Sequence, residues 1–145
     1  FVVDAVHDDF IAKFVAETKR LRFGDGLSKA EIGPLVSEAA RAKVMRLVDD
    51  AIEKGAKVEI GGRIPPDHPV GWFYEPTILT DVTPAMDLMQ AEMFGPVAPI
   101  FRFETEAEAI AQQDIAIPRL VSELATTGVS VTARGATTSP AAFVP

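Results

Sequence analysis

Residues 37–60 read S-E-A-A-R-A-K-V-M-R-L-V-D-D-A-I-E-K-G-A-K-V-E-I, and this stretch places one helix directly before one strand. Apolar residues recur at helical spacing with charged residues on the opposite face, which predicts an amphipathic helix over about 37–54. Its predicted buried face comprises Ala40, Val44, Leu47, Val48 and Ile52. Ser37 suits the N-cap, and Gly55 suits a left-handed stop. Charged and apolar residues then alternate over 57–60, as they do in a short strand.

A similar periodicity nearer the start of the chain predicts a helix over 8–21, capped by Asp8 or Asp9. Its expected apolar stripe is Phe10, Phe14, Val15 and Leu21. The run T-E-A-E at 105–108 is a capping box, so another helix is expected to begin at Glu106.

Glycines and prolines crowd residues 61–71, which predicts a surface loop. Residues 73–79 look extended around Pro76, and residues 99–103 form a compact apolar run. Helices interleaved with strands in this order predict an α/β fold. The strands should be at least partly parallel, because such spacing provides the crossover connections that parallel neighbours need.

The chain has 145 residues, a common size for one domain, and its 48% apolar and 24% charged residues are typical of a folded globular protein. Its net charge of −7 disfavours contact with a phosphate backbone, so no nucleic-acid partner is expected. Apolar runs fall short of the roughly 20 residues that cross a bilayer, and no basic leader precedes the first helix. We therefore expect a cytoplasmic protein with no membrane partner.

The sequence contains no cysteine, which removes thiolate ligands and thiol nucleophiles from it. The two histidines, His7 and His68, lie far apart and show none of the usual ligand spacings, so no metal site is predicted. The glycine-containing turns also lack the G-x-G-x-x-G spacing of a dinucleotide-binding loop.

The composition changes near residue 112. Two acidic and two basic residues lie beyond residue 111, namely Asp114, Glu123, Arg119 and Arg134. Small and polar residues then dominate without helical or alternating period, which predicts a loop-like or disordered tail. We therefore predict one folded segment over 1–111, followed by a divergent tail over 112–145.

The stretch Q-A-E-M-F-G-P-V-A-P at 90–99 has the most distinctive chemistry in the chain. The carboxylate of Glu92 could hold a ribose diol while the nearby ring of Phe94 packs on a flat heterocycle. The alternative interpretation is a core phenylalanine and a solvated glutamate, which is the commoner use of these residue types.

Six motifs occur in an order and spacing that resemble the aldehyde dehydrogenase superfamily, in the part of its catalytic domain that follows the nucleophilic cysteine. They are F-V-V-D-A-V-H-D-D-F from Phe1, F-G-D-G from Phe23, I-G-P-L-V from Ile32, K-G-A-K-V from Lys54, G-W-F-Y-E-P-T-I-L from Gly71 and A-E-M-F-G-P-V-A-P from Ala91. The run A-P-I-F-R-F-E-T-E-A-E-A-I-A from Ala98 is most similar to the succinate-semialdehyde dehydrogenase branch. The resemblance covers residues 1 to about 111. It implies a partial catalytic domain with a mostly parallel sheet flanked by helices.

In that family a cysteine thiolate attacks the aldehyde and NAD or NADP accepts the hydride, which leads to the carboxylic acid. By resemblance, Glu92 matches the glutamate that binds the nicotinamide ribose hydroxyls, and Phe94 matches the ring that packs near the nicotinamide. Lys43 matches a lysine near the same ribose. The resemblance also implies a small-molecule aldehyde substrate and a homo-oligomeric parent enzyme. The matching nucleophile would precede Phe1, so we expect no catalytic residue in this chain and no activity of the chain alone.

Two departures from the family pattern stand out. Ala91 replaces the first of two acids, and Q-Q-D-I-A-I-P-R-L follows Ala111 where the family has an asparagine-containing stretch leading to Y-G-L. A shift of reading frame or a divergent terminus would explain the second departure. The alternative function is a non-catalytic remnant or an interaction module that associates with subunits of its own family through open strand edges. An unrelated α/β binding domain is the third hypothesis.

Overall fold

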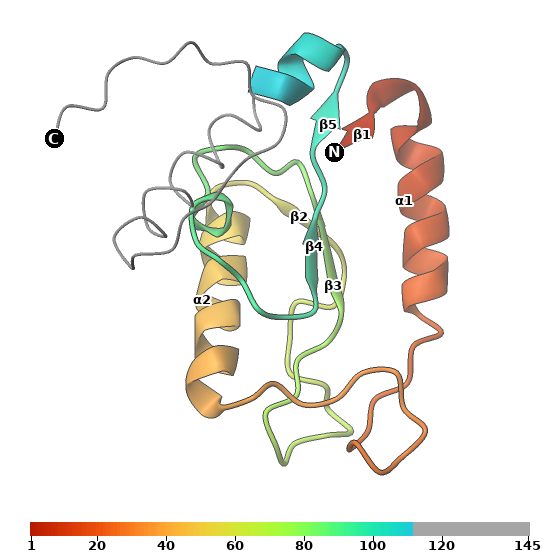
Figure 1. Cartoon of the computed structure of the whole chain (residues 1–145), viewed down its shortest axis with the longest axis vertical. Helices are drawn as coiled ribbons and strands as arrows, with labels where there is room; N and C mark the ends of the chain where they lie inside the picture. The colour runs from red at the N-terminus through yellow and green to blue at the C-terminus, as the bar shows by residue number, and fades with distance from the viewer. Residues whose placement is uncertain (112–145) are drawn as a thin grey trace, which may run out of the picture.

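The computed structural model describes residues 1–111, and Figure 1 shows how their helices and strands are arranged. In chain order the elements are β1 (Val2–Val3), α1 (Asp4–Thr18), α2 (Glu38–Glu53), β2 (Lys57–Ile60), β3 (Thr77–Thr80), the 3-10 turn η1 (Asp87–Met89), β4 (Val97–Pro99) and β5 (Arg102–Phe103). A further helix begins at the predicted Glu106 and continues to residue 111. The predicted tail over 112–145, with the reading-frame hypothesis attached to it, lies outside the described residues.

Strand pairing confirms the predicted α/β class. The sheet order β2-β3-β4 places β3 in the centre, antiparallel to β2 and parallel to β4. Strands β1 and β5 form a separate parallel pair in which Val2 lies opposite Arg102. The parallel pairing of β3 with β4 requires the chain to cross back, and residues 81–96, which contain η1, make that connection.

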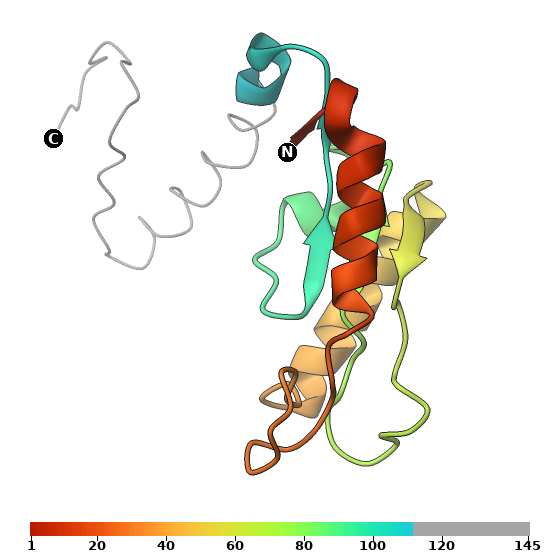
Figure 2. The same ribbon diagram turned by 90° about the vertical axis from the view of Figure 1, so that its right-hand side faces the viewer.

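The central strand β3 is covered on both faces. Figures 1 and 2 show the three-stranded sheet between α1 on one side and α2 on the other. Ile78 packs in a cluster with Ile11 of α1, whereas Leu79 packs in a cluster with side chains of α2. Because side chains alternate between the two faces of a strand, this arrangement buries all four residues of β3.

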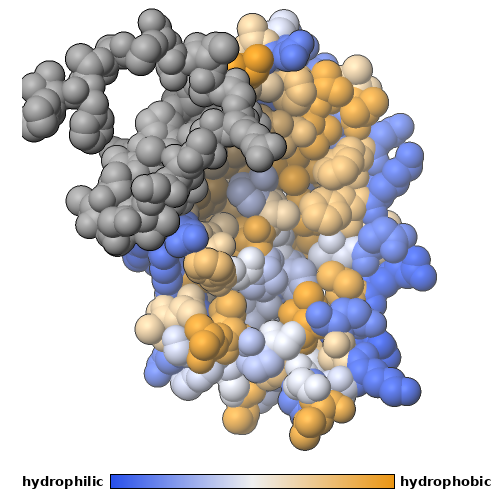
Figure 3. Space-filling model, viewed as in Figure 1, coloured by the Kyte–Doolittle hydropathy of each residue, from blue (hydrophilic) through white to orange (hydrophobic). Residues whose placement is uncertain are grey.

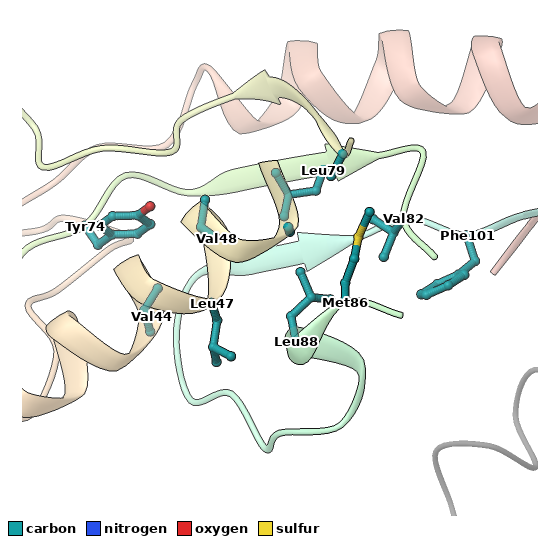
Figure 4. Packing of buried hydrophobic residues seen from close by; sticks show 11 residues of the cluster. Val44, Leu47, Val48, Tyr74, Leu79, Val82, Met86, Leu88 and Phe101 are labelled. Carbon is teal, nitrogen blue, oxygen red and sulfur yellow. The ribbon is translucent and has the colours of Figure 1, made fainter. Parts of the chain in front are cut away.

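The larger apolar cluster lies between α2 and the sheet, and Figure 4 shows it from close by. Its labelled members are Val44, Leu47, Val48, Tyr74, Leu79, Val82, Met86, Leu88 and Phe101. Burial of this apolar surface fixes α2 against the sheet. Val44, Leu47 and Val48 of the predicted face are buried, and Ala40 is half-buried. The prediction is wrong at Ile52, which is 42% exposed, while its neighbour Ala51 is fully buried.

Both ends of α2 match the sequence prediction. The Ser37 Oγ accepts a hydrogen bond from the backbone amide of Ala40 at 3.1 Å. Gly55 adopts a φ of +102°, a left-handed conformation that glycine takes without steric cost. Strand β2 then spans the predicted residues 57–60.

The start of α1 differs from the prediction. The helix begins at Asp4, so the prediction of a cap at Asp8 or Asp9 is wrong. Arg102 of β5 accounts for the difference, because its guanidinium pairs with the carboxylates of both Asp4 and Asp8. Asp8 also bonds the Nδ1 of His7 at 2.9 Å; this hydrogen bond and the nearby Arg102 charge lower the pKa of the Asp8 carboxyl. These acids therefore tie the first turns of α1 to β5 and do not cap the helix.

The predicted apolar stripe of α1 is confirmed only in part. The buried residues are His7, Ile11 and Thr18, whereas Phe10 is 41% exposed. Phe14 and Val15 of the predicted stripe are partly buried and pack against the cluster of Ile11, Ile78 and Ile100, as expected. Leu21 lies beyond the end of the helix.

The remaining predictions for this part of the chain hold with small changes. The Thr105 Oγ1 accepts from the Glu108 amide at 3.3 Å, but the Glu108 carboxylate accepts from the Glu104 amide at 3.0 Å and not from that of Thr105. The apolar run 99–103 is divided between β4 and β5, which belong to different sheets.

Within residues 1–111 there is no helix with the length and hydropathy needed to span a bilayer.

Candidate functional site

A cavity of about 530 Å³ lies between the first half of α2 and the turn that precedes β4. It is lined by Pro34, Leu35, Val36, Ala40, Lys43, Val44, Phe94 and Gly95. Its volume falls within the range of roughly 300–1,000 Å³ typical of small-molecule sites, and an apolar lining with few polar groups is typical of such sites too. We refer to it below as the α2 cavity.

Phe94 lies at the rim of the α2 cavity and is not a core residue. It is 76% exposed, so the interpretation of Phe94 as a core phenylalanine is wrong. The turn that carries it is bonded to the sheet, because the Thr77 amide donates to the Pro96 carbonyl at 2.8 Å. The Val97 amide also donates to the Gly95 carbonyl at 2.8 Å. The ring is therefore exposed on a backbone segment that is itself well held.

Gly95 brings this turn unusually close to α2. A Cβ built on Gly95 would lie 2.6 Å from the Cγ2 of Val44, much closer than carbon atoms approach without overlap. Val44 is 1% exposed and belongs to the main core, so it has little room to move. Only glycine lets Phe94 lie above α2 at this distance.

Lys43 and Phe94 line the same cavity, one from α2 and the other from the turn before β4. Lys43 is exposed, and its ammonium has no ion-pair partner among residues 1–111. An ammonium donor and an aromatic face around an apolar hollow can receive a flat heterocycle attached to a hydroxylated sugar.

The structure does not bring Glu92 into the lining of the α2 cavity. Glu92 is exposed and lies in a segment with no helix or strand, two residues before Phe94. A carboxylate accepts hydrogen bonds, which is the chemistry that sugar hydroxyls require. Of the three residues inferred from the sequence, the structure therefore brings Lys43 and Phe94 to one cavity and leaves Glu92 outside its lining.

An ion-pair network holds the segment that leads to Glu92 against α2. The Nζ of Lys54 lies 2.7 Å from a carboxylate oxygen of Asp50 and 2.9 Å from one of Asp87 in η1. The Asp50 carboxylate also accepts from the backbone amide of Asp87 at 2.8 Å. The hydrogen bond from Lys54 is the main cause of the lowered pKa of Asp50.

The two histidines lie apart from the α2 cavity. His68 lies between the rings of Phe23 and Phe73, at centroid distances of 5.8 and 5.0 Å. His7 lies on α1 beside Asp8. Neither residue lines the α2 cavity. Among residues 1–111 no group of three or more His, Cys, Asp or Glu side chains is arranged to hold a metal ion.

Sequence reasoning did not assign Leu35, Val36 or Gly95 to the site, although all three line the α2 cavity. Leu35 and Val36 form one wall, although the motif I-G-P-L-V that contains them had been noticed. Gly95 had been quoted only as a letter of the motif A-E-M-F-G-P-V-A-P. Its close approach to Val44 depends on where α2 packs, and no local signal could have revealed it.

Comparisons with known proteins relate the chain to a family. Residues 1–138 match the model described as "Aldehyde dehydrogenase family". The betaine aldehyde dehydrogenase of Bacillus subtilis is 45% identical over 112 residues, which are 75% of this chain and 23% of that protein. The NADP(+) succinate-semialdehyde dehydrogenase of Escherichia coli is 45% identical over 113 residues, 77% of this chain and 23% of that protein.

Solved structures give the same result. An NADP-dependent enzyme of E. coli is similar with a TM-score of 0.72 at 46% identity, over 77% of this chain and 23% of that one. The betaine aldehyde dehydrogenase of Staphylococcus aureus in complex with NAD+ has a TM-score of 0.72 at 35% identity, over 77% and 23% of the two chains. The chain therefore spans about a quarter of the length of the curated relatives that it matches.

Proposed function

Because the chain belongs to the aldehyde dehydrogenase family, we propose that it is part of an NAD- or NADP-dependent enzyme that oxidises an aldehyde to the carboxylic acid. Residues 1–111 supply the contacts to the nicotinamide ribose in this proposal. The observation that carries it is the α2 cavity, where Lys43 and the exposed ring of Phe94 meet from two separate elements.

The proposed roles follow from the chemistry of each side chain. The Phe94 ring packs on the flat base, and the Lys43 ammonium donates to a ribose oxygen. The Glu92 carboxylate accepts hydrogen bonds from the ribose hydroxyls. The cofactor, when bound, accepts the hydride released by the aldehyde. The chain's own contribution is to hold the sugar and base in one orientation.

The chain alone should bind the cofactor weakly and should not turn over. Its sequence has no cysteine, and positioning cannot replace a thiolate nucleophile.

Succinate semialdehyde is the proposed aldehyde, because the run from Ala98 resembles that branch and such dehydrogenases recur among the relatives. The betaine aldehyde dehydrogenase of B. subtilis is equally identical at 45%, so betaine aldehyde is the competing substrate. A cytoplasmic, homo-oligomeric parent enzyme completes the proposal.

Cofactor binding by the 145-residue chain tests the proposal. Titration of reduced nicotinamide mononucleotide, followed by its own fluorescence, isolates the nicotinamide half. Glu92→Gln should weaken binding about 10-fold, the loss expected for a charge-assisted hydrogen bond, and Phe94→Ala should weaken it about 3- to 10-fold. Glu53→Gln removes an exposed acid from the far end of α2 and is the matched control. Binding that is absent in the wild type, or equal in all variants, contradicts the proposal.

An exposed apolar stripe supports a second candidate function, association with subunits of its own family. Val3, Val6 and Phe10 follow one another at helical spacing around the start of α1, and all three are exposed. Figure 3 shows apolar surface gathered inside a hydrophilic right-hand rim, in the region of α1 and β1. Among the described strands, β2 and β4 each have one unpaired edge.

Size-exclusion chromatography with light scattering tests this second function. The wild-type chain should form a dimer or larger assembly at low micromolar concentration, and Val6→Lys should shift it toward the monomer. A wild-type chain that elutes as a clean monomer counts against association.

A further inference from the structure

One wall of the α2 cavity has little secondary structure to support it. Leu35 and Val36 belong to the loop before α2, and the Val36 side chain is almost fully exposed. The Leu35 backbone amide donates to the carbonyl of Trp72 at 2.9 Å, a residue 37 positions further along the chain. The position of this wall therefore depends on what holds Trp72.

Arg41 of α2 holds the segment around Trp72 at two points. Its guanidinium donates to the Gly71 carbonyl at 3.0 Å. The same group lies over the Trp72 ring, with its Cζ 5.1 Å from the ring centroid. Tryptophan is the most favourable ring for a cation–π contact, and arginine is the cation found over it more often. Neither Arg41 nor Trp72 lines the α2 cavity.

We propose that Arg41 and Trp72 form a clamp that positions the Leu35 wall of the α2 cavity and so raises its affinity for the nicotinamide ribose without touching it. This inference rests on the proposed function. Arg41 and Trp72 are positioning residues, and they act through the backbone of Leu35.

The physical basis is preorganisation. A loop that is free before binding must lose conformational entropy when a ligand orders it, and that loss weakens the observed affinity. With the clamp in place, residues 34–36 are already ordered by the hydrogen bond from Leu35 to Trp72. Without it, α2 and the turn carrying Phe94 keep their places, because other contacts hold them, but the facing wall becomes mobile.

The experiment compares Arg41→Met with Arg46→Met in the 145-residue chain. Both variants remove one positive charge from α2, so any long-range attraction of an anionic ligand falls equally. Arg46 pairs with Asp87 at 3.4 Å and does not contact residues 71–72. Asp87 keeps its 2.9 Å bridge to Lys54 and its 2.8 Å backbone-amide hydrogen bond to Asp50 in Arg46→Met, so this variant is the matched control. Arg41→Lys is the partial-rescue variant, because it keeps a cation near the Trp72 ring but loses the planar guanidinium that stacks on it.

Two readouts are measured in each variant. The first is the dissociation constant for reduced nicotinamide mononucleotide. The second is the hydrogen-exchange rate of the Leu35 amide by NMR. Arg41→Met should raise the dissociation constant about 5-fold and speed Leu35 exchange at least about 5-fold, because it removes one cation–π contact and one hydrogen bond. Arg46→Met should change both by less than about 2-fold, and Arg41→Lys should recover part of both.

The outcomes separate the clamp from the proposed function. If the wild type binds and Arg41→Met binds equally well, the clamp is refuted while the proposed function stands. If the wild type does not bind, the proposed function fails and the claimed gain in affinity falls with it. Leu35 exchange then still reports on the contact itself, and a rate unchanged by Arg41→Met refutes that part too. Far-UV circular dichroism checks that each variant remains folded.

Discussion

Replacing Gly95 with alanine should destabilise the chain and remove Phe94 from the rim of the α2 cavity. The added Cβ would lie 2.6 Å from the Cγ2 and 3.4 Å from the Cγ1 of Val44. Carbon atoms at rest lie about 3.5–4.0 Å apart, so the turn or the core must give way by roughly 1 Å. Gly95 is not among the glycines with positive φ, so the cost comes from space and not from backbone conformation.

The magnitude follows from what surrounds the new methyl group. Overpacking a tight core by one carbon costs about 1–3 kcal/mol, and Val44 is too deeply buried to move aside cheaply. The turn is the part free to shift, since Phe94 on its outer side is mostly exposed. We therefore expect Gly95→Ala to lower the free energy of unfolding by about 1–3 kcal/mol and to weaken cofactor binding as well.

Urea unfolding followed by the fluorescence of Trp72, the single tryptophan, measures the first effect. The matched control is Gly26→Ala, because a Cβ at Gly26 would meet nothing within 4 Å. A glycine at such an open position should tolerate alanine or gain about 0.4–1 kcal/mol from it.

A double-mutant cycle with Val44→Ala identifies the clash as the cause. Val44→Ala alone should cost about 2 kcal/mol, because it removes buried methyl groups. In the double mutant the Gly95→Ala penalty should largely disappear, and binding of reduced nicotinamide mononucleotide should recover in part. Additivity within about 0.5 kcal/mol, or a Gly95→Ala effect no larger than that of Gly26→Ala, would refute the steric argument.

Three further outcomes are expected. Hydrogen bonds from Arg22 lower the pKa of Glu31 to about 2. The stability that Glu31 contributes should therefore be full above pH 4.5, the pKa of the unfolded side chain, and should be lost as the pH falls toward 2. Urea unfolding across that pH range should show a steeper loss of stability in the wild type than in Glu31→Gln. Burial raises the pKa of Tyr74 to about 12, and because it is the single tyrosine, phenolate absorbance should rise near pH 12 in the folded chain, whereas a midpoint near 10 contradicts its burial. Ser37→Ala should cost about 1 kcal/mol in urea unfolding, since it removes the N-cap of α2, and Ser37→Thr should retain most of that stability.

The unit from α2 to β2 was predictable from sequence because its signals are local. The Ser37 cap reaches the amide of Ala40 three residues away, and Gly55 ends the helix through its own backbone freedom. The amphipathic pattern over 38–53 also predicts a helix whichever part of the chain covers its apolar face. Such short-range chemistry holds whatever the rest of the chain does.

The start of α1 was not predictable for the opposite reason. Asp8 has the residue type and position of a good cap, yet its carboxylate pairs with Arg102, which lies 94 residues further along the chain. That partner is brought near only by the parallel pairing of β1 with β5. Local preference yields to a long-range ion pair in this case, and the helix gains a turn.

The candidate site divides along the same line. Sequence alone determined the residue types. The acid and the ring of Glu92 and Phe94 can be seen in one motif, and Lys43 was assigned through the resemblance to the family. Only the tertiary structure decided that Lys43 and Phe94 share a cavity, that Glu92 lies outside its lining, and that Leu35 closes one wall. The physical reason is that a cavity is a property of packing: its shape depends on how closely Gly95 approaches Val44, and chain spacing carries no record of that distance.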